Sequence, residues 1–494
     1  MGDTDTLEYP ISEQTLRLLF GASSSTDLEK SLEIFEEISK SASGRSELSS
    51  KGILPAVLEI IHSAPCTSQH HFLPLSLKLL RNLCAGEIAN QNSFVELKGA
   101  GIVSNVLRSV ASCSDPDQGL ARVCLQVLAN VSLAGKDHQH AIWEELYPNG
   151  FVSLARLRNR GTCDPLCMII YTCYGGNPEL VRKLYSDSGW PIMVEIIRTA
   201  SLVGFGEDWL KLLLSRICLE ESQLPLLFSK LWSGAASEGE VSEFRDDQLS
   251  SEQAFLLEIV AEILNERITD VAVTRDVALF VYEIFKHSIG VLEHAPKAKS
   301  GIPTGCAAID VLGYSISIMR DICAQDDVKG GIKGESEDVV NELLSQGLID
   351  LLLSLLHDLE PPAIIRKAIK QSEKRDKAEA SRLRKPCLYK GFRRDIVALV
   401  GNCLYRRKHA QDEIRGKNGI ILLLQQCVTD EDNPFLREWG IWSVRNMLEG
   451  NEENQRAVAE LEVQGSVDVP EISALGLRVE IDQKTRRAKL VNVP

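Results

Sequence analysis

The chain has 494 residues, too many for a single compact core and enough for about ten helical repeats of roughly 45 residues each. Hydrophobic residues make up 44% and aromatic residues only 6%, which excludes a disordered chain and favours helical cores of Leu, Ile, Val and Ala over a β-rich fold. The net charge of −15 excludes general nucleic-acid binding, because an acidic surface repels phosphate backbones, and it suits basic partners.

The first ten residues, MGDTDTLEYP, are acidic and lack the apolar segment of a signal peptide. Gly2 fits the short myristoylation pattern, and the alternatives of a lipidated and a plain acidic terminus stay open. No apolar run reaches the roughly 18 residues that a membrane-spanning helix needs. The most apolar run, Leu348 to Leu356, is short and carries Asp350, so we expect no transmembrane segment.

A spacing of Asn and Gln recurs near both ends of the chain. Each Asn lies near the end of an apolar, helix-like run, and a Gln follows nine positions later in four places: Asn82 with Gln91, Asn130 with Gln139, Asn402 with Gln411, and Asn446 with Gln455. The first two Asn lie 48 residues apart and the last two lie 44 apart. A period in the 40s with helical patterning is typical of armadillo and HEAT arrays. We therefore predict an all-α, armadillo/HEAT-like superhelical solenoid whose function lies on its surface.

The first half of the chain divides by composition. Residues 1–232 are predicted to form N-terminal armadillo-like repeats, because apolar positions recur there at helical spacing between Gly and Pro breaks. Residues 233–252 carry several acids and little apolar content, which predicts an acidic linker or loop. Residues 253–365 resume helical periodicity and are predicted as middle repeats, with a flexible insert near 325–338.

The second half begins with a basic segment, the one place where the overall negative charge of the chain is locally reversed. Residues 366–390 form a basic loop or helix segment that continues to Arg394. This segment could bind an acidic partner or an anionic membrane, or it could be a solvated loop, and interspersed acids weaken its field. Residues 391–460 are predicted as a C-terminal helical domain. In the tail, 461–494, short alternating or apolar runs predict a small β hairpin or an extended tail.

The C-terminal domain carries recognisable residues. They are Gly391-Phe392-Arg393-Arg394-Asp395, Asn402, Gln411-Asp412, Gly419-Ile420, Asp432-Asn433-Pro434-Phe435, Glu438-Trp439, Arg445-Asn446 and Glu452-Glu453-Asn454-Gln455. This set closely resembles the C-terminal domain of the ataxin-10 family, and the N-terminal repeats agree more loosely. The resemblance implies a cytoplasmic armadillo-type scaffold without catalytic activity, associated with protein–protein interaction, cell division and cell survival or differentiation.

The repeated Asn residues are candidate partner-binding groups. In armadillo arrays the third helix of each repeat lines a concave face, where an Asn amide can pair with the backbone of an extended peptide. By resemblance, Asn82, Asn130, Asn402 and Asn446 occupy that place. The alternative is that each Asn binds carbonyls at a helix end or a neighbouring loop. The Gln residues fit a structural role better, tying one helix end to the next.

Trp442 and two arginines complete the candidate partner-binding set. Import receptors of this class pair each Asn with a Trp four residues earlier, and here only Trp442 with Asn446 fits. This argues against the alternative function, a nuclear transport receptor or cargo adaptor. Trp439 and Trp442 are either core residues or an exposed binding patch. Arg393 and Arg394, which belong to both the basic stretch and the resemblance, are further candidates for partner contact.

Motifs of enzyme chemistry do not occur in the sequence: it has no phosphate-binding loop, no HExxH and no nucleophile elbow. Cys163, Cys167 and Cys173 lack zinc-site spacing, and His138 with His140 lacks a third ligand. The 13 scattered cysteines indicate reduced core thiols in a cytoplasmic protein. We therefore expect no cofactor, no metal and no catalysis, with other proteins as partners and self-association left open.

Overall fold

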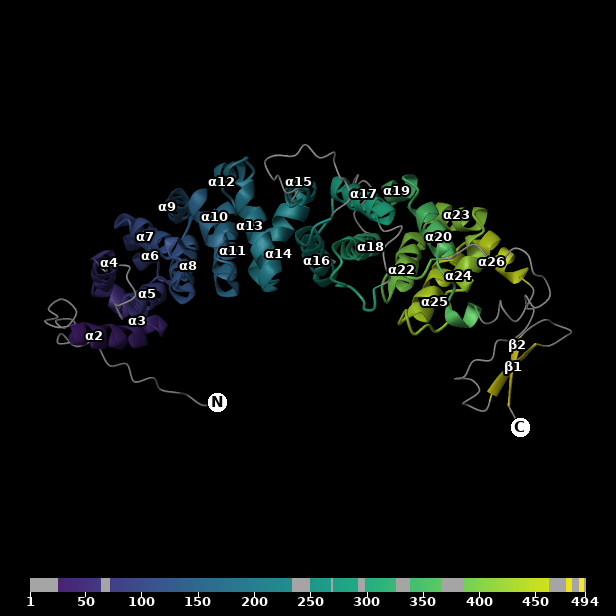
Figure 1. Ribbon diagram of the computed structural model, residues 1–494, viewed down its shortest axis with the longest axis horizontal. Helices are drawn as coiled ribbons and strands as arrows, with labels where there is room; N and C mark the ends of the chain where they lie inside the picture. Colours follow the sequence, from purple (N-terminus) through teal and green to yellow (C-terminus); the bar gives the residue numbers. More distant parts are fainter. Residues whose placement is uncertain are drawn as a thin grey trace. The chain divides into compact units, whose positions relative to one another are not determined.

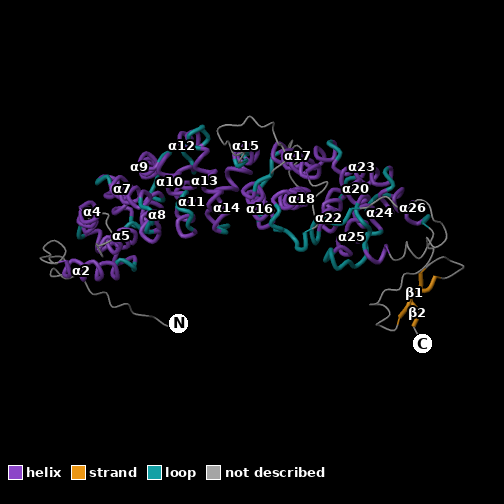
Figure 2. The backbone as a smooth tube through the Cα atoms, viewed as in Figure 1, coloured by secondary structure: helices purple, strands orange, loops and turns teal. Residues whose placement is uncertain are grey.

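A computed structural model describes residues 25–63, 72–232, 249–267, 270–291, 298–325, 338–366, 385–461, 477–481 and 488–492. The described residues are helical apart from short loops and one pair of strands, so the all-α prediction is confirmed (Figure 2). Two compact units divide the chain, Met1–Ser233 and Gly234–Pro494. Each unit is an array of stacked helices, and each is described by itself below.

The first unit is built from helices that follow one another in threes. In chain order they are α2 (Ser25–Ile38), α3 (Ala42–Ser50), α4 (Ile53–Ser63), α5 (Phe72–Leu83), α6 (Ile88–Glu96), α7 (Gly99–Ser112), α8 (Gln118–Ser132), α9 (Lys136–Leu146), α10 (Asn149–Ala155), α11 (Arg160–Tyr174), α12 (Pro178–Leu184), α13 (Trp190–Val203), α14 (Asp208–Leu214), the π-helix η1 (Ser215–Glu220) and α15 (Leu224–Lys230).

Equivalent helices of successive repeats stack on one another in the first unit. The first helices pack in the order α2, α5, α8, α11, α14, and the third helices pack in the order α4, α7, α10, α13, α15 (Figure 1). The seam between these two layers is apolar: Leu83, Val103, Leu125 and Ile170 are all fully buried. Each repeat therefore buries its apolar face against its neighbours, as a solenoid requires.

The second unit continues the same pattern. Its elements are α16 (Ser251–Glu266), α17 (Arg275–Val291), α18 (Ala307–Gln325), α19 (Val339–Ser345), α20 (Leu348–Asp358), α22 (Phe392–Leu404), α23 (Lys408–Gly416), α24 (Gly419–Leu424), α25 (Leu436–Leu448), α26 (Glu452–Ala459), β1 (Leu477–Ile481) and β2 (Ala488–Asn492). Helices α16, α18, α22 and α25 pack in that order, and α20 packs on α24. Among the described residues, the last complete triplet is α22, α23 and α24.

Helix starts in both units follow local capping chemistry. Asp117, Asn177 and Asn451 each accept a backbone N–H from the first turn of α8, α12 and α26, respectively. At the start of α16, Ser250 and Gln253 form a reciprocal capping box. These side chains fix where the helices begin and so set the frame of each repeat.

The turn from the second to the third helix of a repeat depends on a glycine. Lys98 and Asn418 adopt left-handed φ values of 56° and 57°, and Gly99 and Gly419 follow them as the first residues of α7 and α24. A Cβ on Gly99 would lie 2.5 Å from the buried ring of Phe94, and a Cβ on Gly419 would lie 3.0 Å from Ile414. Only glycine permits this close approach of the two helices.

The tail contains the small hairpin that the sequence analysis offered as one of two alternatives. β1 pairs antiparallel with β2, with Leu477 opposite Asn492 and Ile481 opposite Ala488. Much of the predicted segments 233–252, 325–338, 366–390 and 461–494 lies outside the described residues, as does Gly2, so those boundaries and that lipidation site stay predictions.

Among the described helices, none alone has the length and hydropathy to cross a bilayer. The pair Val339–Ser345 and Leu348–Asp358 meets the criteria jointly, with a bend of 61° between the two helices. Leu348, Ile349 and Leu352 of this pair are fully buried in the helical array.

Candidate partner-binding site

The four Asn side chains form regular contacts between neighbouring repeats. The Nδ2 of Asn130 donates to the Arg81 carbonyl at 3.0 Å, and the Nδ2 of Asn446 donates to the Gly401 carbonyl at 2.9 Å. Arg81 and Gly401 each directly precede the Asn of the previous repeat. Asn402 donates in the same way to the Arg320 carbonyl of α18 at 3.0 Å. One donor of each amide thus holds the preceding repeat in register.

Asn82 departs from this pattern because the helix before it, α2, offers side chains instead. Its Nδ2 lies 3.0 Å from Ser39 Oγ and 3.4 Å from Glu36 Oε1. The guanidinium of Arg81 donates to its Oδ1 at 2.9 Å. Asn82 is therefore tied to side chains of the first repeat.

Two of the four Gln residues, Gln91 and Gln411, bind in the opposite direction along the array. Gln91 Nε2 donates to the Cys84 carbonyl at the end of its own first helix and to the Asn130 carbonyl of the next repeat, both at 2.9 Å. Gln411 repeats this with Leu404 at 3.2 Å and Asn446 at 2.8 Å. These contacts agree with the structural role expected of the Gln positions. They occur at two places that are separated by most of the chain.

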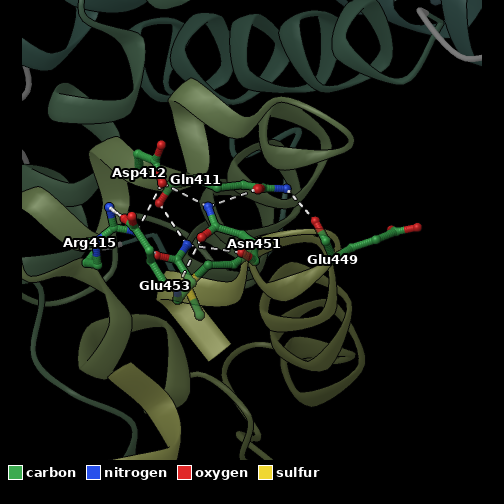
Figure 3. A network of polar contacts seen from close by, with 8 residues as sticks. Gln411, Asp412, Arg415, Glu449, Asn451 and Glu453 are labelled. Carbon is green, nitrogen blue, oxygen red and sulfur yellow. Dashed lines mark hydrogen bonds and ion pairs between the residues drawn. The ribbon is translucent and has the colours of Figure 1, made fainter. Parts of the chain in front are cut away.

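Figure 3 shows how the Gln411 contact is held in place. Asn451 donates its amide to Gln411 Oε1 at 3.2 Å and to Asp412 Oδ1 at 2.9 Å, while Arg415 donates to the same Asp412 oxygen at 3.0 Å. The hydrogen bond from Asn451, followed by that from Arg415, lowers the pKa of Asp412 below its usual value. Arg415 also pairs with Glu453 of α26. The network fastens α23 to α26.

A hollow of about 580 Å³ lies in the second unit where three successive repeats meet. Its lining residues come from the ends of α18, α22 and α25 and from the starts of α19 and α23: Cys323, Ala324, Asp338, Asn341, Asn402, Tyr405, Arg406, Arg407, Lys408, His409, Trp442 and Asn446. Three of the seven candidate residues, Asn402, Trp442 and Asn446, therefore lie together around one depression.

Cations outnumber anions in this hollow. Arg406 and Arg407 lie in the short connection from α22 to α23, Lys408 is the first residue of α23, and Asp338 is the one carboxylate among the lining residues. Arg406 adopts a left-handed φ of 53° and stacks its guanidinium over the Tyr405 ring at 5.0 Å. Arg407 is buried, which lowers its pKa, and its Nη2 lies 3.8 Å from Asp338 Oδ1. The hollow is a positive site in a chain of net negative charge.

Asn446 leaves one polar atom unused in the wall of the hollow. Its side chain is fully buried, and its Nδ2 is fixed by the Gly401 carbonyl, which also fixes the orientation of the amide. The Oδ1 has no hydrogen-bond partner among the described residues. A buried acceptor without a donor is uncommon in native proteins and calls for an explanation.

The two tryptophans differ in exposure. Trp442 is 40% exposed and lies under the guanidinium of Arg445, with 4.8 Å from Arg445 Cζ to the ring centroid. Trp439 is half-buried. Of the two alternatives considered for this pair, an exposed patch describes Trp442 and partial packing describes Trp439.

The two arginine candidates lie elsewhere. Arg393 is only 1% exposed, and its guanidinium donates to Gln426 Oε1 at 3.1 Å and to the Glu360 carbonyl. Arg394 forms a two-point ion pair with the buried Asp395. Both cations have partners within the protein, and a role in partner contact stays a prediction. Asn82 and Asn130 belong to the first unit and line no part of this hollow.

The cations of the hollow were not predicted, because they lie beyond the basic stretch that ends at Arg394. The available signal was the run Arg406 to His409, placed directly after an Asn-bearing helix. Among the described residues, no group of three or more His, Cys, Asp or Glu is arranged to hold a metal ion.

The stacked helix triplets define an armadillo-type helical-repeat protein. A family model described as the spinocerebellar ataxia type 10 protein domain matches residues 392–491. Ataxin-10 of Xenopus tropicalis is 23% identical over 88% of this chain and 86% of its own length, and ataxin-10 of Homo sapiens is 24% identical over 82% and 78%. Residues 392–491 thus match the ataxin-10 domain, and most of the chain is similar to ataxin-10 proteins.

Two further comparisons differ in what they cover. An ataxin-10 homolog of Dictyostelium discoideum is 37% identical over 21% of this chain and 17% of its own length. A solved designed armadillo repeat protein, 14% identical, covers 51% of this chain and 99% of its own, with a TM-score of 0.32. At that score the likeness carries no weight, and the fold assignment rests on the helix packing described above.

Proposed function

We propose that this protein is a non-enzymatic scaffold that binds segments of other proteins, and that its second unit does so in the hollow between α19, α23 and α25. The supporting observation is the gathering of Asn402, Trp442 and Asn446 around one depression of about 580 Å³. An exposed indole beside one buried and one half-buried amide is a combination that can hold an extended chain, with apolar contact from the indole and backbone hydrogen bonds from the amides.

We also propose that the protein works in the cytoplasm, in cell division or in cell survival and differentiation. These processes come from the resemblance to the ataxin-10 family. Regular helix stacking with short connections supports an interaction role of this kind, because it presents a long surface built from many repeats.

The charge of the hollow supports the scaffold over the nuclear transport receptor. A receptor for basic import signals needs acidic or neutral walls, since like charges placed together oppose binding. Arg406, Arg407 and Lys408 instead provide a local positive field. A basic localisation peptide should therefore bind poorly at this site.

Affinity purification of the full chain tests the proposal. Trp442→Ala removes an indole that is 40% exposed, and Trp232→Ala, its matched control, removes one that is 45% exposed in the first unit. We expect a set of proteins to be recovered with the wild type and with Trp232→Ala and to be lost with Trp442→Ala. Identical recovery with all three proteins would show that the hollow is not the binding site.

A further inference from the structure

We infer that the hollow of the second unit binds an extended acidic segment of a partner protein, with its carboxylates at the start of α23 and its backbone at Asn446. This inference rests on the proposed function and specifies the chemistry of the partner. Three independent features of the site support it: the sign of its charges, the uncapped helix end and the unused acceptor.

The charge of the lining residues favours an anionic ligand. Arg406 and Lys408 are exposed, Arg407 is buried, and Asp338 is the one lining carboxylate, so the hollow carries an excess of positive charge. The whole chain has 69 acidic against 54 basic residues, which makes this local excess distinctive. Charge complementarity of this kind selects among partners and steers their approach.

The start of α23 adds hydrogen-bond donors to these cations. Arg407 is the N-cap of this nine-residue helix, and its side chain accepts no hydrogen bond from the first turn. The first bond within the helix runs from the Gln411 N–H to the Arg407 carbonyl. The three preceding N–H groups therefore have no partner within the helix and, together with the helix dipole, favour a carboxylate.

Asn446, by contrast, requires the ligand to provide a hydrogen-bond donor. Its Oδ1 is buried without a partner among the described residues, while its Nδ2 is committed to the Gly401 carbonyl. A peptide backbone carries an N–H donor as well as acidic side chains, whereas an anion without a donor, such as sulfate, would leave the Oδ1 unsatisfied. Because the Oδ1 is covered, a side chain in the wall must move when the ligand binds.

Fluorescence anisotropy with three labelled peptides of equal length tests the inference. The acidic probe alternates Glu and Gly, the neutral probe alternates Gln and Gly, and the basic probe alternates Lys and Gly. We expect the full chain to bind the acidic probe most tightly. Reversing one charge by Lys408→Glu should weaken that binding about tenfold, which corresponds to the loss of one charge-assisted contact.

Arg437→Glu is the matched control. Arg437 is exposed on α25, outside the lining, and its reversal changes the net charge of the protein by the same amount. It should leave the affinity for the acidic probe within about twofold of the wild type, since only screened long-range charge is altered. Equal losses for Lys408→Glu and Arg437→Glu would overturn the inference, as would equal binding of the acidic and neutral probes.

Two further results separate this inference from the proposed function. If Trp442→Ala abolishes partner recovery while the acidic probe does not bind, the hollow is a binding site for another chemistry and only the acidic inference fails. If inorganic phosphate displaces the acidic probe as effectively as the unlabelled acidic peptide does, the site selects small anions and not a protein segment. Failure of both the probe and the Trp442→Ala purification would overturn both proposals.

Discussion

Gln411 and Asn446 bind each other's repeats in a reciprocal manner. Gln411 Nε2 donates to the Asn446 carbonyl at 2.8 Å, and Asn446 Nδ2 donates to the Gly401 carbonyl of the helix that precedes Gln411. Two side-chain amides thus satisfy backbone carbonyls on both sides of one repeat boundary. The same exchange joins Gln91 with Asn130, and Asn130 with Arg81, in the first unit.

The Gln411 contact should contribute measurably to stability. Gln411→Ala removes the side-chain donor shared by the Leu404, Asn446 and Glu449 carbonyls, so it should lower the free energy of unfolding by about 1–3 kcal/mol. Gln455→Ala is the control, because the exposed Gln455 binds only the Leu448 carbonyl of its own repeat, and the loss should be below about 0.5 kcal/mol. Urea unfolding followed by circular dichroism measures both; equal losses would mean that the link between repeats adds nothing.

Leu83 and Asn82 are adjacent in α5 but should differ in their effect on stability. Leu83 is fully buried in the stack, and Leu83→Ala should cost about 2–5 kcal/mol because it opens a cavity. Asn82→Ala removes the half-buried contacts to Ser39 and Glu36 and should cost about 0.5–1.5 kcal/mol. Thermal unfolding of the two variants checks this order, and the reverse order would show that the polar contact dominates the core contact.

Gly99 should tolerate no side chain. Gly99→Ala places a methyl group 2.5 Å from the ring of Phe94, which is fully buried and has no room to move, so we expect a loss of about 1–3 kcal/mol. Gly416→Ala in α23 meets nothing within 4 Å and should stabilise the protein by about 0.5–1 kcal/mol through helix propensity. Differential scanning calorimetry should show shifts of opposite sign, and a lowered unfolding temperature for Gly416→Ala would contradict this account.

Glu195 should make stability depend on pH. Burial opposes its charge, but the hydrogen bond from Arg198 and the charges of Arg158 and Arg156 outweigh that effect and lower its pKa from the usual 4.5. The Arg158 and Arg198 contacts measure 2.8 and 3.0 Å. Because the folded protein holds this proton less tightly than the unfolded chain, the contribution of Glu195 is complete above pH 4.5 and is lost as the pH falls through the folded value.

Glu195→Gln measures that contribution. At neutral pH this variant should be less stable than the wild type by about 1.5–3 kcal/mol, because a charged hydrogen-bond acceptor has been replaced by a neutral one. Below the folded pKa of Glu195 the difference should shrink, since the wild-type carboxyl is then also neutral. Urea midpoints of both proteins across an acidic pH series provide the test, and a constant difference over the series would count against a lowered pKa.

The periodic parts of this fold were predictable from sequence because the physics that fixes them is local. The nine-residue spacing from Asn82 to Gln91 marks the end of one helix and the helix that follows it. Because the same pair recurs 48 residues later, at Asn130 and Gln139, the approximate repeat length could be obtained from residue numbers alone. Alternation in the tail predicted a hairpin as one of two alternatives, and the structure pairs Leu477–Ile481 with Ala488–Asn492.

Other parts depended on contacts between distant residues and could not be predicted in this way. The π-helix Ser215–Glu220 directly continues α14, and Pro165 lies inside α11 although proline usually ends a helix. Arg393 was a candidate for partner contact, yet it is buried and donates to Gln426 and to the Glu360 carbonyl. The hollow combines residues from Cys323 to Asn446, and no sequence window contains them all.

The amides between repeats bind main-chain carbonyls, a group that every amino acid possesses. The carbonyl that accepts from Asn130 belongs to an arginine and the one that accepts from Asn446 belongs to a glycine, yet the two hydrogen bonds have similar lengths of 3.0 and 2.9 Å. A substitution at Arg81 therefore keeps the main-chain acceptor, whereas at Gly401 an added Cβ would lie 2.6 Å from Ser443 Oγ, which limits replacement there. An array fastened in this way can drift far in sequence, provided that a few Asn and Gln residues persist, while its outward-facing positions remain available for new partners.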